Sequence, residues 1–354
     1  MKVSTRPARW LAATAAVVLA LVGVGPGPAA ASLGGGPRVV QDGVQLPKDE
    51  APHQEPEEWW YYTGHLTGTD PAGKVRSYGF EYTTFQLLDA APEPVYFGNV
   101  AITDLTTGTF TYGFEMDSYP VPNTPNRFAL HTGDWTMSGG SGRSTLHAAI
   151  PGYTFDLKTQ TSALPVLHGD KGVIPYGPLG SSKYYSWTSL LTSGTIVDHG
   201  VTVKVTGLSW FDHQWGAFDF STGAGWDWHS IQLTNGRQYM LYFIRDSSGA
   251  IVESLGTQVD QAGTKVTRLN PATFSETVTG SWTSPATGIT YSSGWKLNVP
   301  GGSLTITPRQ VDQEVDLTAT PQGNAYWEGD VTVRGVLNGA PVTGAGYTEI
   351  NPTN

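Results

Sequence analysis

Cysteine is absent from this chain of 354 residues. No disulfide can therefore stabilise the fold, and the same absence excludes thiolate metal sites and cysteine nucleophiles. Positive charge is also scarce, because 20 Lys and Arg stand against 30 Asp and Glu, which gives a formal net charge of −10. This balance argues against nucleic acid as a partner. Charged residues make up only 14% of the chain, so burial of apolar surface has to supply the stability.

Amphipathic helical segments are missing as well, since no long stretch repeats its apolar residues with a period of 3.6. The chain instead contains 44 Gly, 12 Trp and 16 Tyr, a mixture typical of turn-rich β structure. Strands are expected at residues 59–66, 77–88, 96–104, 110–114, 135–137 and 146–149, with a hairpin turn at 67–73 between the first two. Many short strands predict an all-β protein of barrels or sandwiches.

The N-terminal segment has the features of a signal peptide. Three basic residues precede an apolar run at residues 10–24, and small residues follow at 29–31. The apolar run is shorter than the roughly 20 residues that a membrane span needs. We therefore expect residues 1–31 to be cleaved off after Ala31, the mature protein to be secreted, and residues 32–44 to form a flexible linker. A retained N-terminal anchor is the alternative.

A weak internal repeat predicts two domains. The segments that begin at Trp59 and at Trp226 each reach a leucine after seven residues, and a Gly-containing turn and an aromatic strand follow. In the second copy the turn contains Asn235-Gly236, a strong signal for a two-residue hairpin turn. Turn residues near 192–200 mark the expected boundary between domains at 45–195 and 196–354.

A series of short aromatic motifs runs along the mature chain. They are Glu58–Leu66 (EWWYYTGHL), Tyr184-Tyr185-Ser186, Trp210–Gly216 (WFDHQWG), Trp226-Asp227-Trp228, Met240-Leu241-Tyr242 with Arg245, Trp327-Glu328-Gly329 and Gly346–Glu349 (GYTE). In content and order they resemble the family that contains the AttH proteins and the carotenoid 1,2-hydratases. This resemblance implies two tandem lipocalin-like antiparallel β-barrel or sandwich domains, with a ligand cavity at or between them.

The same resemblance implies a function. It points to a protein that binds an extended hydrophobic metabolite (an isoprenoid, lipid or polyketide), and it leaves open whether the protein also hydrates or isomerises this ligand by acid catalysis. We expect a monomer without cofactor or metal. A non-catalytic carrier or an accessory component of an ABC export system is the first alternative, and carbohydrate binding on an aromatic face also stays open. A secreted hydrolase is a weaker alternative, because the chain has no G-x-S-x-G or H-E-x-x-H motif.

The segment 210–216 supplies candidate catalytic residues. Side chains alternate along a strand, so His213 and Trp215 share one face and Asp212 points to the other. An acid beside an aromatic wall can protonate an alkene and stabilise the carbocation that results. A structural role for Asp212 and His213, as partners of buried backbone groups, is the alternative.

Tyr242 is the third catalytic candidate. In the hydratases, as the resemblance implies, the His-x-Trp pair is joined by a Tyr and an Asp two positions apart, but here Ile244 stands two residues after Tyr242. The nearest acid is Asp246, which we expect in a turn. This departure places the chain nearer to the AttH branch than to the hydratases.

Ligand-binding candidates are the aromatic residues of these motifs, namely Trp60, Tyr62, Tyr185, Trp215, Trp226 and Trp228. Glu58 can be an acid at the cavity rim with a raised pKa, or an ion-pair partner of Arg245 or another basic residue. Glu328 and Glu349 carry the same two interpretations.

Overall fold

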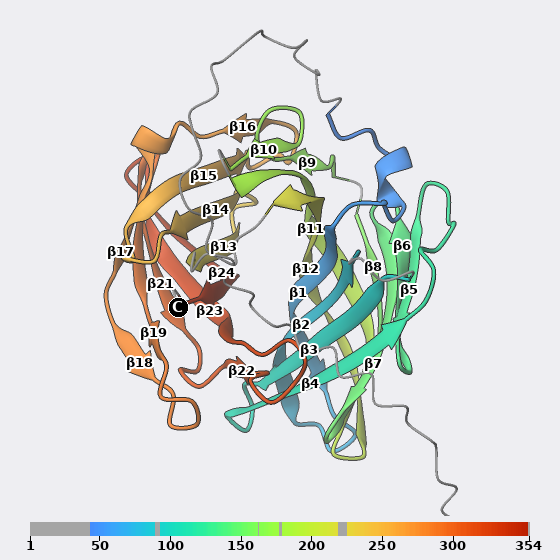
Figure 1. Cartoon of the computed structure of the whole chain (residues 1–354). Helices are drawn as coiled ribbons and strands as arrows, with labels where there is room; N and C mark the ends of the chain where they lie inside the picture. Colours follow the sequence, from blue (N-terminus) through green and yellow to red (C-terminus); the bar gives the residue numbers. More distant parts are fainter. Residues whose placement is uncertain (1–42, 89–92, 162, 177–178, 219–224, 353–354) are drawn as a thin grey trace, which may run out of the picture. The chain divides into compact units, whose positions relative to one another are not determined.

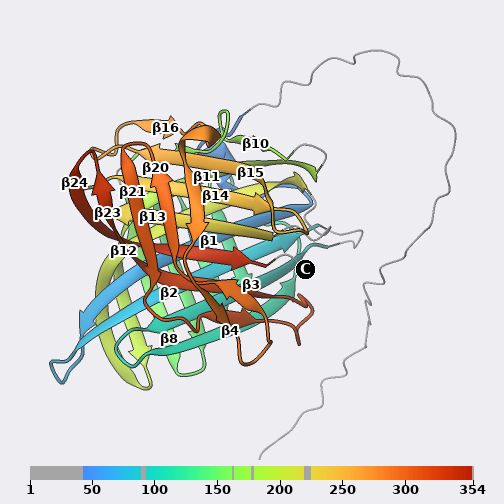
Figure 2. The same cartoon turned by 90° about the vertical axis from the view of Figure 1, so that its left-hand side faces the viewer.

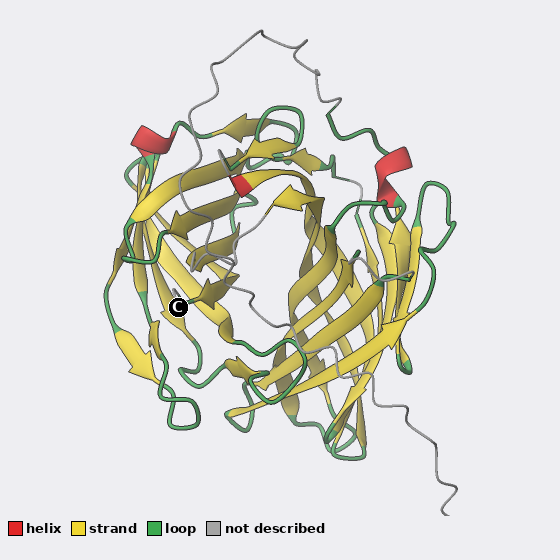
Figure 3. Ribbon diagram, in the orientation of Figure 1, coloured by secondary structure: helices red, strands yellow, loops and turns green. Residues whose placement is uncertain are grey.

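The structure is a computed structural model that describes residues 43–88, 93–161, 163–176, 179–218 and 225–352. These residues are almost entirely β structure, with short 3-10 helices such as η1 (Lys48–Glu50) and η3 (Pro271–Thr273) (Figure 3). Within them, no helix has the length and apolar character needed to cross a membrane. The expected signal peptide and nearly all of the expected linker lie outside the described residues.

The first sheet is antiparallel, and its strands follow the path β4-β3-β2-β1-β12-β11-β8-β7-β6-β5, with β9 and β10 paired to β11. Its strands are β1 (Glu57–Thr69), β2 (Val75–Leu87), β3 (Val95–Asp104), β4 (Thr109–Ser118), β5 (Phe128–Thr132), β6 (Trp135–Gly140), β7 (Arg143–Ile150), β8 (Tyr153–Gln160), β9 (Val166–Leu167), β10 (Val173–Pro175), β11 (Gly180–Asp198) and β12 (Val201–Phe218). The last strand of the path, β5, contacts β3 and β4, so the sheet curls into a nearly closed barrel (Figure 1).

The second sheet is also antiparallel and follows the path β16-β15-β14-β13-β24-β23-β21-β20-β17, with β22 paired to β23. Its strands are β13 (Gly225–Leu233), β14 (Gln238–Arg245), β15 (Ile251–Val259), β16 (Val266–Arg268), β17 (Ser275–Val278), β20 (Trp295–Val299), β21 (Gly302–Pro308), β22 (Glu314–Asp316), β23 (Ala325–Leu337) and β24 (Ala340–Asn351). A separate hairpin consists of β18 (Ser281–Thr283) and β19 (Thr290–Ser292).

Burial follows the residue pattern of each strand. Strand β8, which lies between β11 and β7, alternates apolar and polar residues, and every second side chain is buried. By contrast β1, β12, β13 and β14 carry long buried runs, because both of their faces are covered. Each sheet encloses a core of its own, and a third apolar cluster joins side chains of β1, β11 and β12 to side chains of β13, β14 and β24.

The two sheets meet where β1 and β2 of the first lie against β24 and β23 of the second. Figures 1 and 2 show this side-by-side arrangement from two directions. Residues Gln41–Asn354 form one compact unit.

The fold confirms the predicted all-β, lipocalin-like architecture with two barrel-like halves. The two halves divide later than the expected boundary at residues 195 and 196, because β12 pairs with β1 and β11 and so belongs to the first sheet. The first sheet ends at Phe218 and the second begins at Gly225.

Candidate functional site

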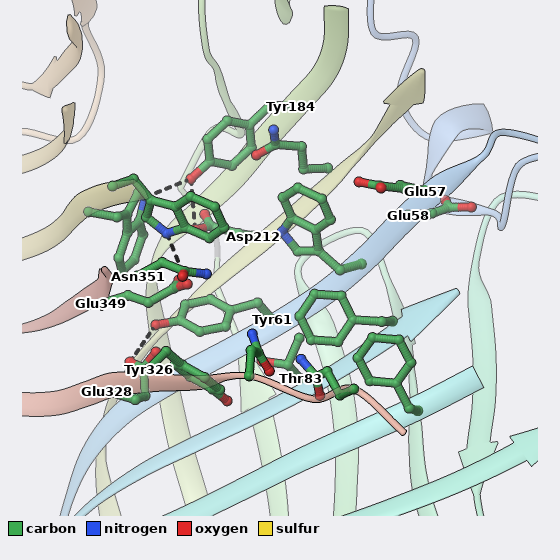
Figure 4. A pocket seen from close by; sticks show the side chains of 18 of the residues that line it. Glu57, Glu58, Tyr61, Thr83, Tyr184, Asp212, Tyr326, Glu328, Glu349 and Asn351 are labelled. Carbon is green, nitrogen blue, oxygen red and sulfur yellow. Dashed lines mark hydrogen bonds between the residues drawn. The ribbon is translucent and has the colours of Figure 1, made fainter. Parts of the chain in front are cut away.

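A cavity of about 360 Å³ lies between the two sheets. Its wall combines aromatic and carboxyl side chains, and β1, β11 and β12 of the first sheet and β13, β14, β23 and β24 of the second all contribute. Its volume lies within the range of small-molecule sites. Asp212, Glu349 and Glu328 gather at one end, whereas Glu57 and Glu58 lie at the other (Figure 4).

The alternation of β12 decides which of its side chains reach this cavity. Asp212 and Gln214 line it, whereas His213 points into the interior of the first sheet. The predicted divergence of Asp212 and His213 is therefore confirmed. On β1 the same alternation turns Tyr61 toward the cavity and leaves Trp60 in the first core.

Three donors hold the carboxyl group of Asp212. The Tyr184 hydroxyl donates to Oδ2 at 2.8 Å, the Trp210 indole Nε1 donates to Oδ1 at 2.7 Å, and the Ser186 hydroxyl also donates to Oδ1. Trp228 Nε1 donates in turn to the Tyr184 hydroxyl at 3.1 Å, across the junction of the sheets. Burial raises the pKa of Asp212 to about 7, in spite of these donors, which by themselves lower it.

Glu349 and Glu328 are neighbours across the β23–β24 pair. Trp226 Nε1 donates to Glu349 Oε1 at 3.0 Å, and burial raises the pKa of this carboxyl to about 7. The Tyr61 hydroxyl donates to Glu328 Oε1 at 2.8 Å. Burial, together with the charges of Glu349 and Glu81, raises the pKa of Glu328 well above its usual range.

Glu58 faces away from these carboxyls and belongs to a second polar cluster. Its Oε1 lies 2.7 Å from both His53 Nδ1 and His213 Nε2, and its Oε2 accepts from Gln86 Nε2 at 3.2 Å. Burial alone would raise the pKa of Glu58, but the two histidines lower it, so the expected raised pKa is corrected. Its partners are His53 and His213, so the expected pairing is with a basic residue other than Arg245.

The cluster of His53, Glu58 and His213 could also hold a metal ion, because one ligand atom from each lies within 4.8 Å of the others. His213 lies 155 positions from Glu58 in the sequence, so no local sequence motif predicts this cluster. Burial lowers the pKa of His213 to about 4, while hydrogen bonds to Asp49 and Glu58 outweigh burial and raise that of His53 to about 9. One neutral and one charged histidine thus satisfy the carboxylate.

Arg245 lies in the second half of the chain, where it pairs with Asp227 at 3.1 Å and with Glu276. Asp246 lies in the expected turn, where its Oδ1 accepts from the backbone of Ser248 at 2.9 Å. It does not line the cavity between the sheets.

Four of the predicted site residues line this cavity, namely Asp212, Tyr242, Trp226 and Trp228. The other five do not line it and are buried within the first sheet, namely His213, Trp60, Tyr62, Tyr185 and Trp215. The predicted residues thus lie on strands that border the cavity, but on the first sheet mostly on the face directed away from it.

Tyr61 and Tyr184 are cavity residues that the prediction passed over in favour of their neighbours. A shift of one residue changes the face of a strand, and both faces here are aromatic, so hydrophobicity does not distinguish them. The face on which Asp212 lies could have identified them, because Tyr61 and Tyr184 pair in register at or close to Asp212 on the adjacent strands.

Comparison with known proteins gives one family. The family described as AttH-like matches residues 38–352. The crystal structure of a protein described as AttH from Nitrosomonas europaea is similar with a TM-score of 0.79 and 28% identity, over 90% of this chain and 100% of that one. Kievitone hydratase from Nectria haematococca is similar in fold, with a TM-score of 0.70 and 18% identity, over 88% of this chain and 93% of that one. A dehydratase of Emericella nidulans is 21% identical over 265 residues, which are 71% of this chain and 75% of that protein.

Proposed function

The chain belongs to the AttH-like family. We propose that it binds an extended hydrophobic metabolite between its two sheets and either adds water to a carbon–carbon double bond of this ligand or removes water from an alcohol to form such a bond. The observation that carries this proposal is the set of buried carboxyl groups beside aromatic rings in one cavity of small-molecule size. A hydratase and a dehydratase are among the similar proteins, which favours water addition or removal over other acid-catalysed reactions.

Glu349 is the proton donor in this proposal. Only Trp226 donates to its carboxyl group among the described residues, so one oxygen is left to carry a proton toward a ligand. The O–H bond of Glu349 breaks, the π electrons of the alkene form a C–H bond with this proton, and the more substituted carbon becomes a carbocation. An acid whose pKa lies near the working pH suits such a transfer.

Asp212 is the proton acceptor. Three donors stabilise its ionised form, whereas Glu349 has one, so Asp212 is the first of the two to lose its proton. A water molecule forms the C–O bond with the carbocation and gives its extra proton to Asp212. The reverse sequence removes water from an alcohol, with each carboxyl group in the opposite role.

The aromatic wall stabilises the intermediate. The indoles of Trp226 and Trp228 and the rings of Tyr61 and Tyr242 line the same cavity as the two acids. Ring faces attract positive charge, more strongly where water is excluded. Because such rings cannot replace a proton donor, they contribute to rate only together with the acids.

The reaction can be tested in D2O with a prenylated phenol as the substrate, because its side chain carries a trisubstituted double bond. Mass spectrometry detects the product. We expect wild-type protein to form the deuterated tertiary alcohol, and Glu349→Gln and Asp212→Asn each to lower the rate by about 100-fold or more. Asp246→Asn is the matched control, because this acid lies in an exposed turn outside the cavity. Full activity of either cavity variant contradicts the assignment, and binding without turnover by the wild type supports a carrier instead.

We further propose that the protein is secreted after cleavage following Ala31. The support is the basic, apolar and small-residue order of the first 31 residues. N-terminal sequencing of the protein from the medium of an expressing bacterial culture should begin at Ser32. A cell-retained chain that still begins at Met1 contradicts export.

A further inference from the structure

The charged side chains that line the cavity are all of one sign. Asp212, Glu328 and Glu349 stand at one end and Glu57 and Glu58 at the other, and no Lys, Arg or His is among the described lining residues. A ligand with a buried carboxylate or phosphate would find no counter-charge there and several like charges. The lining therefore excludes anionic head groups from the end that carries Asp212.

A buried polar atom at this end also has no hydrogen-bond partner among the residues that the structure describes. Glu328 Oε2 accepts no hydrogen bond, although the residue is only 1% exposed. Tyr242 lines the same cavity at 5% exposure. Buried acceptors without donors are costly, so they indicate a group supplied by a ligand.

Aromatic rings surround the same end at steep angles to one another. Tyr61 and Trp228 meet at 87° with ring centroids 5.4 Å apart, and Trp226 and Tyr242 meet at 88° with centroids 6.4 Å apart. All four rings line the cavity, and pairs at such steep angles present ring planes in more than one direction around it. Such aromatic cages recognise ammonium groups.

We propose that the cavity recognises an organic cation, namely a tertiary or quaternary ammonium group carried by an otherwise apolar ligand. The group lies between the four rings, and its positive charge favours the ionised forms of Glu328 and Glu349 over their protonated forms. A protonated tertiary amine then donates its N–H to Glu328 Oε2. This inference rests on the proposed function, because the rings and carboxyl groups that stabilise the carbocation of the proposed reaction are the same ones that bind the ammonium group.

Three small probes separate charge from shape. Phenyltrimethylammonium and tert-butylbenzene have nearly the same size and differ in charge, and benzoate supplies the opposite sign. In calorimetric titrations of the full chain, we expect the ammonium probe to bind about tenfold or more tighter than tert-butylbenzene. Benzoate should not bind in the same concentration range.

A double variant assigns this preference to the carboxyl groups. Glu328→Gln with Glu349→Gln keeps the side-chain shape and removes both charges, so the ammonium probe should lose about tenfold in affinity while tert-butylbenzene changes by less than about twofold. Glu115→Gln, an exposed acid on β4, is the control and should change neither. Thermal unfolding of each variant verifies the fold, and the single Glu328→Gln variant serves if the double variant is unstable.

Equal or tighter binding of tert-butylbenzene overturns the proposal, and so does an ammonium affinity that survives the double variant. Neither measurement involves turnover. A wild-type protein that shows no cation selectivity but hydrates the prenylated phenol therefore refutes this inference alone. A wild-type protein that shows cation selectivity without any turnover refutes the proposed catalysis alone.

Discussion

Asp212 and Glu349 form a pair of buried acids whose environments differ in the number of donors. The pKa of each lies at about 7, well above the usual range of a carboxyl group, because both are buried. If one must be ionised and the other protonated, the rate has to depend on pH on both sides of neutrality.

We expect a bell-shaped profile of kcat/KM with its maximum near pH 7 for hydration of the prenylated phenol. Below the maximum Asp212 becomes protonated and cannot accept a proton from water, and above it Glu349 becomes ionised and cannot donate one. Each limb should fall by about tenfold per pH unit. A rate that stays constant between pH 5 and pH 9 rules out both roles.

His213 has a different position from the one its motif implies. Its ring stacks on Trp60 with centroids 4.7 Å apart and contacts Trp215 at a tilt of 37° with centroids 4.6 Å apart, and it donates to Glu58 inside the first sheet. Replacement by alanine removes a partner from a buried carboxylate and leaves a gap between two indoles.

We therefore expect His213→Ala to lower the free energy of unfolding by about 3 kcal/mol or more. His147→Ala removes a histidine from an exposed pair with Asp156 and should cost less than about 1 kcal/mol. Urea denaturation of the two variants measures the difference. Similar losses in both would show that Glu58 does not depend on His213.

Among the residues of the site, the sequence identifies strands better than faces. Asp212, Trp226, Trp228 and Tyr242 were found because their motifs fall on strands that meet at the cavity. The cluster around Glu58 could not be found, since it combines a loop residue with two strands whose pairing spans more than 150 positions. Only the register of β1 with β12 brings it together.

At the scale of elements, turn chemistry predicted the hairpins well. The β1–β2 hairpin and the hairpin of β13 and β14 both form where Gly-containing turns were expected. The second turn holds three residues between Leu233 and Arg237, and not the expected two, because the backbone N–H of Leu233 donates to the carbonyl of Arg237. Gly236 takes φ of +88° there, which favours glycine.

Close approach of the two sheets depends on Gly79 in β2. A Cβ at this position would lie 2.5 Å from the Tyr347 hydroxyl and 2.8 Å from Asp330 Cβ, both in the second sheet. A Cβ atom cannot lie this close to other heavy atoms, so any larger residue at position 79 has to move β23 and β24 away from β2.

We expect Gly79→Ala to destabilise the protein by about 1 to 3 kcal/mol through overpacking. The control is Gly73→Ala in the β1–β2 turn, where no atom lies within 4 Å and only the strain of φ at +83° is added, about 1 kcal/mol. Thermal unfolding compares them. A smaller loss for Gly79→Ala than for Gly73→Ala would mean that the sheets do not touch closely at this point.

At the scale of the whole chain, the internal repeat predicted two halves but not their union. The halves share an apolar cluster that includes Tyr184, Trp210 and Tyr347, and their strands are buried on both faces as a result. A strand that is buried on both faces appears in the sequence as a continuous apolar or aromatic run, and this run does not indicate which surface covers each face. Composition therefore could not place the cavity between the sheets.

Hydrogen bonds cross the junction along its whole length. Besides Tyr61 to Glu328 and Trp228 to Tyr184, Asn99 Nδ2 donates to the Tyr326 hydroxyl at 3.0 Å. The Thr103 hydroxyl donates to Gln313 at 2.7 Å, and His168 lies 2.9 Å from the Thr257 hydroxyl. Separation of the sheets would leave these buried groups unpaired, so neither half is expected to persist without the other.

We therefore expect a single unfolding transition in differential scanning calorimetry, with equal calorimetric and van't Hoff enthalpies, although the chain contains two barrel-like sheets. Tyr326→Phe, which removes one crossing hydrogen bond, should lower the single melting temperature without splitting it. Two resolved transitions in the wild type would show that each sheet folds alone. The cavity would then be a surface between independent domains, and its carboxyl groups would lose the burial that raises their pKa.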